Sequence, residues 1–194
     1  MVQKRLWLLI ALVLTLLLGA CGPTAAPTAL PTPATTAVPT LAVTVYFGNT
    51  SLDPGMQDCA KVHPVERTTL PSGDVPKAAL EQLFLGPTPA EKANGYVSVF
   101  SAETADILIS VKVQTDTAYV NLKDIRTIIP NASTSCGSAA FFAAVETTVK
   151  GTADVTRVLY AIEGDPQPFW EWMQIGCAPM NDNCDPAPFR DETQ

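Results

Sequence analysis

The sequence predicts an α+β domain with a mixed β-sheet, two helices packed on one face of that sheet, and the order β-β-α-β-β-α-β. Two segments repeat apolar residues at helical spacing, and they stand between short segments rich in β-branched and aromatic residues. This mixture of strand pairs and single helices is typical of α+β proteins. Four cysteines lie within this part of the chain, and an even number indicates disulfides.

Residues 1–20 are predicted to be a signal peptide. Two basic residues, Lys4 and Arg5, precede an uncharged apolar run at residues 6–18. As a helix this run would span about 20 Å, which is short of the roughly 30 Å hydrocarbon core of a bilayer. A secretory signal peptide has this order of a basic, an apolar and a small-residue region. We therefore expect the chain to be exported.

Leu18-Gly19-Ala20-Cys21 follows the apolar run and resembles the lipobox of bacterial lipoproteins. In that motif a branched residue and two small residues precede the cysteine whose thiol carries the lipid. The resemblance implies cleavage before Cys21, lipidation of Cys21, and attachment through the lipid to the extracytoplasmic face of the cell membrane. The alternative is an ordinary signal peptide in which Cys21 has no special role.

Residues 21–41 are predicted to be a disordered tether between the lipidated cysteine and the domain. Between residues 22 and 40 the chain has six Thr, five Pro and five Ala, and it has no charged residue. Such a segment cannot bury a core, and its prolines favour an extended conformation. The folded domain is therefore expected at residues 42–165, followed by an aromatic segment and an acidic tail at residues 166–194.

The first half of the domain is predicted to contain two strands and a helix. Residues 41–47 and 65–70 are rich in β-branched residues, which is typical of strands. Asp74 is a suitable N-cap for the helix that follows, and Gly86-Pro87 is expected to end it. The apolar residues at helical spacing between these limits are Leu80, Leu83 and Phe84.

The second half is predicted to contain a segment at residues 87–105 that is mostly loop, followed by a hairpin, a helix and a last strand. Apolar residues alternate on both sides of a turn at residues 114–116, so each strand of the hairpin is expected to bury one face. The expected buried residues are Ile107, Ile109, Val111 and Val113 on one strand and Ala118, Val120 and Leu122 on the other. A helix at residues 135–150 and a strand at residues 155–162 complete the domain. The helix is expected to bury Phe142, Val145 and Val149.

The cysteines beyond Cys21 are expected to form two disulfides. They are Cys59, Cys136, Cys177 and Cys184, which allow three different pairings. Their closeness favours a bond between Cys177 and Cys184 across a turn-like segment, and this leaves Cys59 to pair with Cys136. A metal site is the competing interpretation, but the spacing is not that of a zinc site and an exported domain is exposed to oxidising conditions.

The composition argues against nucleic-acid binding and against known catalytic centres. The net charge is −7, whereas nucleic-acid binding needs a basic surface. The chain has one histidine, His63, which excludes a metal site with several histidines. None of the motifs GxSxG, SxxK, HExxH or a Walker loop is present, and His63 has no nucleophile in a familiar context. We therefore expect no catalytic residues, no metal and no cofactor.

Pro168-Phe169-Trp170-Glu171-Trp172-Met173 is the most unusual local segment. One interpretation is a short closing helix that covers the end of the core. The other is a docking patch for a partner, formed by Phe169, Trp170 and Trp172, because tryptophan is enriched at interface anchors. On a helix Trp170 would point away from the face shared by Phe169, Trp172 and Met173. An exposed tryptophan would therefore favour docking.

The ordered segments of the domain resemble the GerMN domain of bacterial sporulation and spore-germination lipoproteins. The resemblance covers about residues 42–165. The residues that carry it are Val43-Thr44-Val45-Tyr46-Phe47, Val65-Glu66-Arg67, Ala79-Leu80-Glu81-Gln82-Leu83 with Leu85-Gly86-Pro87, Ile109-Ser110-Val111, Ala118-Tyr119-Val120-Asn121-Leu122, and residues 158–162 with Glu163-Gly164.

The GerMN resemblance implies a non-enzymatic interaction or scaffold module that is tethered to the membrane and binds another envelope protein. The family offers no catalytic motif to carry over. Such domains also occur in bacteria that do not sporulate, so the resemblance alone assigns no role in spores, and the oligomeric state stays open. Two alternatives remain, an envelope hydrolase that uses His63 with a nearby carboxylate, and a small-ligand carrier with an enclosed apolar pocket.

Overall fold

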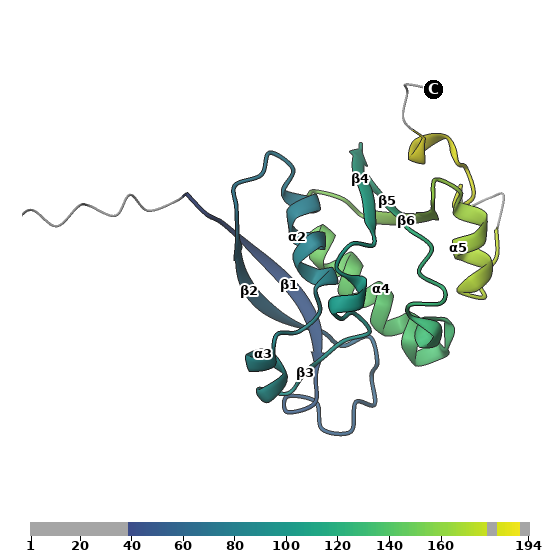
Figure 1. Cartoon of the computed structure of the whole chain (residues 1–194). Coiled ribbons are helices and arrows are strands. Elements are labelled where there is room, and N and C mark those ends of the chain that lie inside the picture. Colours follow the sequence, from purple (N-terminus) through teal and green to yellow (C-terminus); the bar gives the residue numbers. More distant parts are fainter. Residues whose placement is uncertain (1–38, 178–181, 191–194) are drawn as a thin grey trace, which may run out of the picture. The chain divides into compact units, whose positions relative to one another are not determined.

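The computed structural model describes residues 39–177 and 182–190, which belong to one compact unit at residues 38–194 (Figure 1). The described residues form two three-stranded sheets with helices between and beside them. The α+β class with mixed strand directions and disulfides is confirmed. The predicted signal peptide, Cys21 and nearly all of the tether lie outside the described residues.

The first sheet has the order β2-β1-β3 and is antiparallel throughout. Its strands are β1 (Leu41–Asn49), β2 (His63–Thr69) and the short β3 (Tyr96–Val97). Every second residue of β1 is buried, with Val45 opposite Val65 and Phe47 opposite His63. This alternation places one face of β1 on the core.

The second sheet has the order β4-β5-β6. A hairpin joins β4 (Leu108–Gln114) to β5 (Thr117–Leu122), and β6 (Arg157–Ile162) lies parallel to β5. A single sheet was expected, but β1 and β2 pair with no strand of the hairpin. The reason is that the helices separate the two groups of strands.

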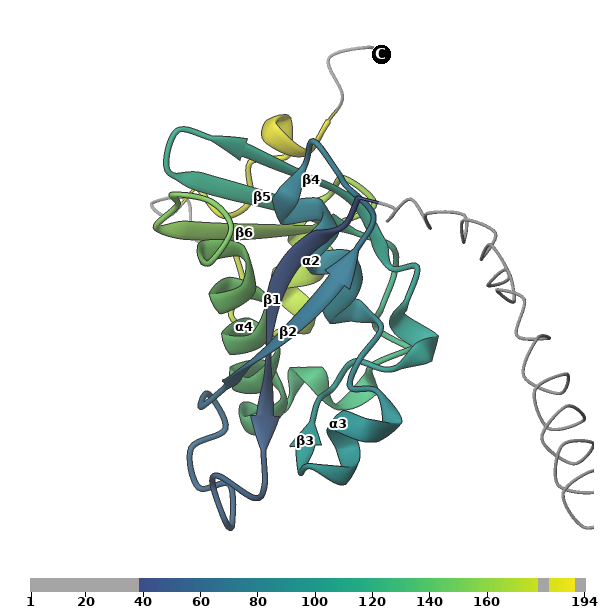
Figure 2. The same cartoon turned by 90° about the vertical axis from the view of Figure 1, so that its left-hand side faces the viewer.

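Helices α2 (Val75–Phe84) and α4 (Ser135–Lys150) lie between the two sheets (Figure 2). Helix α2 contacts β1 and β4, helix α4 contacts β1 and β6, and the two helices contact each other. A side-chain oxygen caps the first turn of each helix. The carboxylate of Asp74 accepts a hydrogen bond from Lys77 N at 3.0 Å, and the hydroxyl of Thr134 accepts one from Gly137 N at 3.1 Å. Each helix therefore packs against both sheets, whereas the sequence predicted both helices on one face of a single sheet.

The region expected to be a loop at residues 87–105 contains regular structure. It holds helix α3 (Pro89–Ala93), strand β3 and a 3₁₀ turn at Ala102–Thr104. Helix α3 begins with a capping box in which Thr88 and Glu91 each accept a backbone hydrogen bond from the other. Segments of two to five residues are too short to show a hydrophobic period, which is why the sequence did not reveal them.

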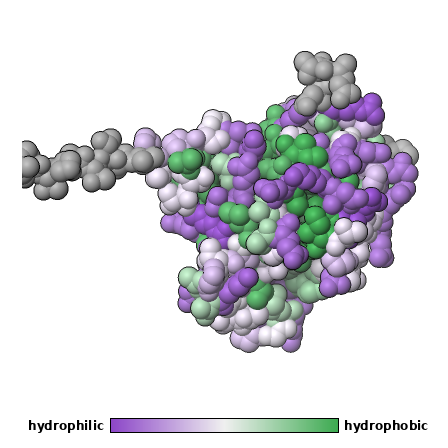
Figure 3. Space-filling view, in the orientation of Figure 1, coloured by the Kyte–Doolittle hydropathy of each residue, from purple (hydrophilic) through white to green (hydrophobic). Residues whose placement is uncertain are grey.

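The buried faces of the hairpin and of α4 differ in part from the expectation. Ala118, Val120 and Leu122 are buried, as are Ile107 and Val111, but Ile109 and Val113 are 44% and 43% exposed. The register of β4 shifts between Leu108 and Ser110, so Ile109 has no partner in β5. Hydrophobic residues reach the surface over β4 (Figure 3). On α4, Phe141 is fully buried, whereas Phe142 is half-buried beside the core.

The C-terminal part of the chain packs against the second sheet. Helix α5 (Pro166–Trp172) contacts β6, and a 3₁₀ turn at Ala187–Phe189 contacts β5. Phe189 meets Tyr119 of β5 edge to face, with ring centroids 5.4 Å apart. The core therefore continues beyond residue 165, where the domain was expected to end.

Candidate functional site

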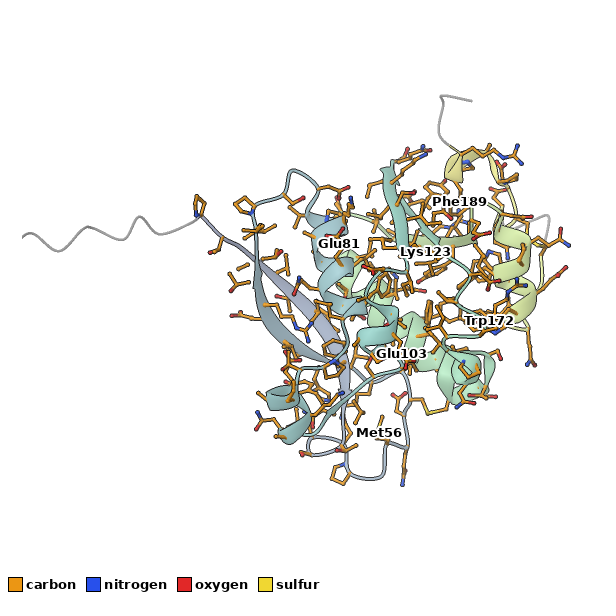
Figure 4. The ribbon with its side chains drawn as sticks, in the orientation of Figure 1. Met56, Glu81, Glu103, Lys123, Trp172 and Phe189 are labelled. Atoms are coloured by element: carbon orange, nitrogen blue, oxygen red, sulfur yellow. A yellow bond between two sulfur atoms is a disulfide. The ribbon has the colours of Figure 1, made fainter. Side chains whose placement is uncertain are left out.

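An apolar hollow opens beside the end of β1, and we call it the Met56 hollow. Its volume is about 170 Å³. Met56, in the loop after β1, is labelled in Figure 4. The residues that line the hollow come from β1, this loop, β3 and the segment after it, and helix α4. They are Phe47, Gly48, Met56, Cys59, Val62, Val97, Ser98, Val99, Ala140 and Ala144.

Small residues create the space of the Met56 hollow. Ala140 and Ala144 lie one turn apart on α4, so both turn toward the same side. Gly48 of β1 faces the loop, and a Cβ atom there would lie 3.2 Å from Met56 Cε and 3.3 Å from Val97 Cγ2. A larger side chain at these positions would take up room that is now free.

The loop wall of the hollow starts at Asn49, whose side chain is buried. Its Oδ1 atom accepts hydrogen bonds from Ser51 N at 2.8 Å and Leu52 N at 3.0 Å, and its Nδ2 atom donates to Asn94 O at 3.2 Å. Thr50 N adds a hydrogen bond to Gly95 O at 2.9 Å. These bonds fix how the loop leaves β1, because the backbone N–H groups of residues 50–53 all have partners.

Asp53 ties the same loop to β2. One carboxylate oxygen pairs with Lys61 Nζ and the other contacts His63 Nε2. These hydrogen bonds lower the pKa of Asp53 below its ordinary value of 3.8. A hydrolase could use such a contact between His63 and a carboxylate. Here the other oxygen of Asp53 pairs with Lys61, so the carboxylate joins two side chains at the end of the loop and the start of β2. Within the described residues no hydroxyl or thiol group hydrogen-bonds to His63.

Two disulfides pair the cysteines in the arrangement that their spacing favoured. Cys59 bonds to Cys136 with a Cα–Cα distance of 5.3 Å, and Cys177 bonds to Cys184 with a distance of 5.5 Å. The first bond joins the loop of the Met56 hollow to the first turn of α4. Cys59 also lines the hollow, so the disulfide forms part of its wall. Among the described residues no group of three or more His, Cys, Asp or Glu side chains is placed to hold a metal ion.

Phe169 and Trp170 lie in the core, which corrects their interpretation as a docking patch. Phe169 is fully buried and stacks on Tyr160 at 4.8 Å between ring centroids. Trp170 is 8% exposed and stacks on Phe142, although it was expected to point away from the core. Trp172 is half-buried beside the core on α5 (Figure 4). The closing-helix interpretation fits these positions, because the aromatic side chains of α5 pack inward.

Arg67 connects three segments beside Phe47, a residue of the hollow. Its guanidinium lies 5.2 Å from the centre of the Phe47 ring and bonds to Glu91, to Gln82 O at 2.5 Å and to Gly86 O at 2.7 Å. Burial raises the pKa of Glu91, but the hydrogen bonds from Arg67 and Thr88 outweigh it and lower the pKa overall. The sequence alone predicts no such role for Arg67 or Glu91.

The Met56 hollow could not be predicted from the sequence, because its residues come from four separate segments. The one local signal is the pair of alanines Ala140 and Ala144 at helical spacing. Small residues that recur on one helix face mark a place where another group approaches closely. Met56 itself carries no such signal, since nothing in its neighbourhood in the sequence indicates that it faces α4.

Comparison with protein families matches residues 44–168 to the family Germane, described as sporulation and spore germination. The chain belongs to the Germane family. The matched part of the Germane domain begins in β1 and ends in α5, so it includes both sheets, α2, α4 and the Met56 hollow. This result confirms the GerMN resemblance and identifies a domain related to sporulation and germination. The bond between Cys177 and Cys184 lies beyond the matched part of the Germane domain.

No curated protein and no solved structure matched the chain. In the part of the Germane protein that the structure describes, no helix is both long enough and apolar enough to cross a membrane.

Proposed function

We propose that this chain is a lipid-anchored, extracytoplasmic protein whose Germane domain is a non-enzymatic interaction module for an envelope protein. The Met56 hollow carries the proposal. Its lining is almost wholly apolar and its volume of about 170 Å³ resembles that of an engineered cavity of roughly 150 Å³ that binds benzene. A hollow of this size suits one large apolar side chain of a partner, and such anchors dominate many interfaces.

Exposed apolar residues around the hollow support the same interpretation. Val97 lines the hollow and is 36% exposed, and Leu52 in the adjoining loop is 59% exposed. Apolar residues that lie together at a surface are typical of interaction sites. The loop that presents them is tied by the Cys59–Cys136 disulfide and by Asp53, so it is held in place before a partner arrives. Preorganisation of this kind favours binding because less conformational freedom is lost.

The two alternatives have less support. An envelope hydrolase is favoured by the contact between His63 and Asp53, but in the described part of the chain no hydroxyl or thiol group hydrogen-bonds to His63, and neither residue lines the hollow. This pair serves instead to close the loop. A carrier of small ligands needs an apolar pocket of roughly 300–1,000 Å³, which is larger than the Met56 hollow. Two hollows of about 540 Å³ and 430 Å³ are large enough, but charged residues such as Arg67, Glu91 and Lys123 line them.

The lipid anchor is tested by replacing Cys21. The proposal rests on Lys4, Arg5 and the segment Leu18-Gly19-Ala20-Cys21. In cells fed a labelled fatty acid, we expect the native chain to carry the label and to remain with the membrane fraction. Cys21→Ala is expected to lose both properties. If Cys21→Ala keeps the label and stays with the membrane, the anchor is wrong.

The interaction site is tested by photo-crosslinking in the producing cells. A photo-reactive residue at Val97 should give one defined adduct with an envelope protein, and the same residue at exposed Ile175 should not. Ala140→Leu fills the hollow and is expected to abolish that adduct. Ala139→Leu is the matched control, because Ala139 neighbours Ala140 on α4 but does not line the hollow. An adduct that survives Ala140→Leu unchanged would rule out the hollow as the binding site.

The family description makes sporulation and germination the first setting in which to look for the partner. If the producing organism forms spores, the crosslinking experiment is run in vegetative cells and again during spore formation. We expect the adduct at Val97 to be stronger in the stage at which the partner is present. An adduct that is equal at all stages argues for a general envelope role.

A further inference from the structure

β4 is an edge strand whose outer side is available for pairing. In the second sheet β4 pairs with β5 alone. The turn between them has two residues, Thr115 and Asp116, and Thr115 has a φ of 55°, as turns of this kind require at their first position. The flanking pair, Gln114 and Thr117, closes such a hairpin with hydrogen bonds, and hydrogen-bonded pairs then alternate with unbonded ones.

The alternation turns the backbone groups of Val111 and Val113 away from β5. Both residues belong to unbonded pairs, so their N–H and C=O groups point to the free edge. Ile109, at the register shift, has no partner in β5 either. Within the described residues no other backbone group hydrogen-bonds to these three positions. At Val111 and Val113 the edge therefore presents unused backbone donors and acceptors.

The side chains at this edge are apolar and exposed. Ile109 is 44% exposed and Val113 is 43% exposed, and hydrophobic residues reach the surface over β4 in Figure 3. Natural edge strands are commonly guarded by charges, proline or β-bulges, because an unguarded edge pairs with other strands. The register shift of β4 lies at Ile109, and from Ser110 to Gln114 the strand continues in regular register with β5. The only charged residue of β4 is Lys112, and its Nζ atom donates to Arg190 O of the same chain at 2.8 Å.

We propose that two copies of this chain pair antiparallel through β4, with the two-fold axis at Val111. In this register Ile109 of one copy lies opposite Val113 of the second copy, and the same contact occurs twice. Lys112 lies opposite Ser110 of the second copy, so no like charges meet. A pattern that complements itself in this way identifies a second copy as the occupant, because an isologous interface requires it.

Neighbouring registers are less favourable. An axis at Lys112 would place Lys112 opposite the same residue of the second copy, and like charges directly opposite destabilise a sheet. An axis at Ser110 would place Val113 opposite Ile107, which is buried and precedes the strand. The paired strands are short and bury little surface, so the dimer is weak and depends on protein concentration.

Cysteine crosslinking tests the register on the full chain. Chains with Ile109→Cys and chains with Val113→Cys are mixed at high concentration under mild oxidation. The mixture should form a disulfide dimer, whereas either variant alone should form little, because residues 109 of the two copies lie four positions apart along the strands. Ile175→Cys, exposed but far from β4 in sequence, measures random collision. Equal crosslinking of the single variants and the mixture would overturn the proposal, as would a mixture that does not exceed Ile175→Cys.

A charge exchange supplies a second test that needs no disulfide. Ile109→Lys with Val113→Lys in one chain places like charges opposite each other twice, and we expect about tenfold weaker dimerisation in sedimentation equilibrium. Ile109→Glu with Val113→Lys places opposite charges at the same two contacts and should restore the dimer. Both variants change exposed positions, and their circular dichroism is compared to confirm folding. If both double variants dimerise as the native chain does, or if neither the native chain nor either variant dimerises, β4 is not the interface.

Discussion

Arg67 holds Glu91 through both carboxylate oxygens and caps the C-terminal end of α2 with the same guanidinium. Its Nε atom lies 3.2 Å from Glu91 Oε1, and its two terminal nitrogens reach Glu91 Oε2, Gln82 O and Gly86 O. The last carbonyl groups of a helix have no partner within the helix. Arg67 supplies that partner from β2 and joins it to α3, so one side chain fixes three elements.

Replacement of Arg67 is expected to destabilise the domain strongly. Arg67→Ala leaves the carboxylate of Glu91 without its partner, and breaking a buried ion pair costs about 3–5 kcal/mol. The side chain of Arg67 is 8% exposed, so water does not replace the lost contacts easily. Urea unfolding of the full chain measures the change. Arg126→Ala is the control, because its ion pair with Asp124 is exposed and is worth about 0–1 kcal/mol.

Alanine substitutions at three glycines distinguish the cost of backbone strain from the cost of steric overlap. Gly86 has a φ of +69°, and a Cβ there would lie 2.3 Å from Phe100 O, so Gly86→Ala is expected to lower the unfolding free energy by more than about 2 kcal/mol. Gly55 has a φ of +86° with open space around it, and Gly55→Ala should cost about 1 kcal/mol. Gly73→Ala meets neither obstacle and should be neutral or slightly stabilising. A different order of stability among the three variants would contradict this account.

The two disulfides are expected to differ in their contribution to stability. Cys59 and Cys136 close a loop with a sequence separation of 77, whereas the separation of Cys177 and Cys184 is 7. On the chain-entropy model the long loop contributes roughly 4–5 kcal/mol and the short loop roughly 2 kcal/mol. Paired serine variants of each bond are compared by thermal and urea unfolding. Equal losses would mean that the entropy of the unfolded chain does not decide the effect.

Phe169→Ala is expected to lower the unfolding free energy by about 3–5 kcal/mol, as is usual when a buried aromatic ring is removed. Phe169 is fully buried against Tyr160 and Phe141, so the change leaves a cavity. Its exposed neighbour in α5, Glu171→Ala, should change stability by no more than about 0.5 kcal/mol. A Phe169→Ala chain of native stability that loses a binding partner would revive the docking interpretation.

Acid should weaken the loop beside the Met56 hollow through Asp53. Hydrogen bonds from Lys61 and His63 lower the pKa of Asp53 in the folded chain below 3.8. Ionised Asp53 therefore stabilises the folded chain at neutral pH, and this contribution is lost as the pH falls below 3.8 toward the folded pKa. The difference in unfolding free energy between the native chain and Asp53→Asn should be largest at neutral pH and should shrink in acid. A difference that grows in acid would contradict the assignment.

The helices were the most predictable elements because their limits are local. Asp74 and Gly86-Pro87 mark the ends of α2 in the sequence, and Asp74 caps the helix as expected. The sheets were less predictable, because strand pairing depends on residues far apart in the chain. Nothing in the alternation of the hairpin reveals the register shift at Ile109, and nothing in residues 41–70 reveals that their sheet stays apart from the other.

Among the site residues, the cysteine pairing could be predicted and the Met56 hollow could not. Spacing alone favoured the bond between Cys177 and Cys184, and elimination then gave the other pair. Trp170 was misjudged for a physical reason, since a helix of seven residues can bury more than one face when both α4 and β6 pack against it. Arg67 lies within a segment that carried the family resemblance, but its partners lie 15 to 24 residues further along the chain.

β1 sets the direction in which the Met56 hollow faces. The chain enters the domain at Leu41, and the hollow begins at Phe47, six residues and roughly 20 Å further along an extended strand. Figure 1 shows the loop after β1 at the far end of this strand from its start. Under the proposed lipid anchor, a partner would therefore reach the hollow at the end of β1 that is remote from the residue where the chain enters the domain.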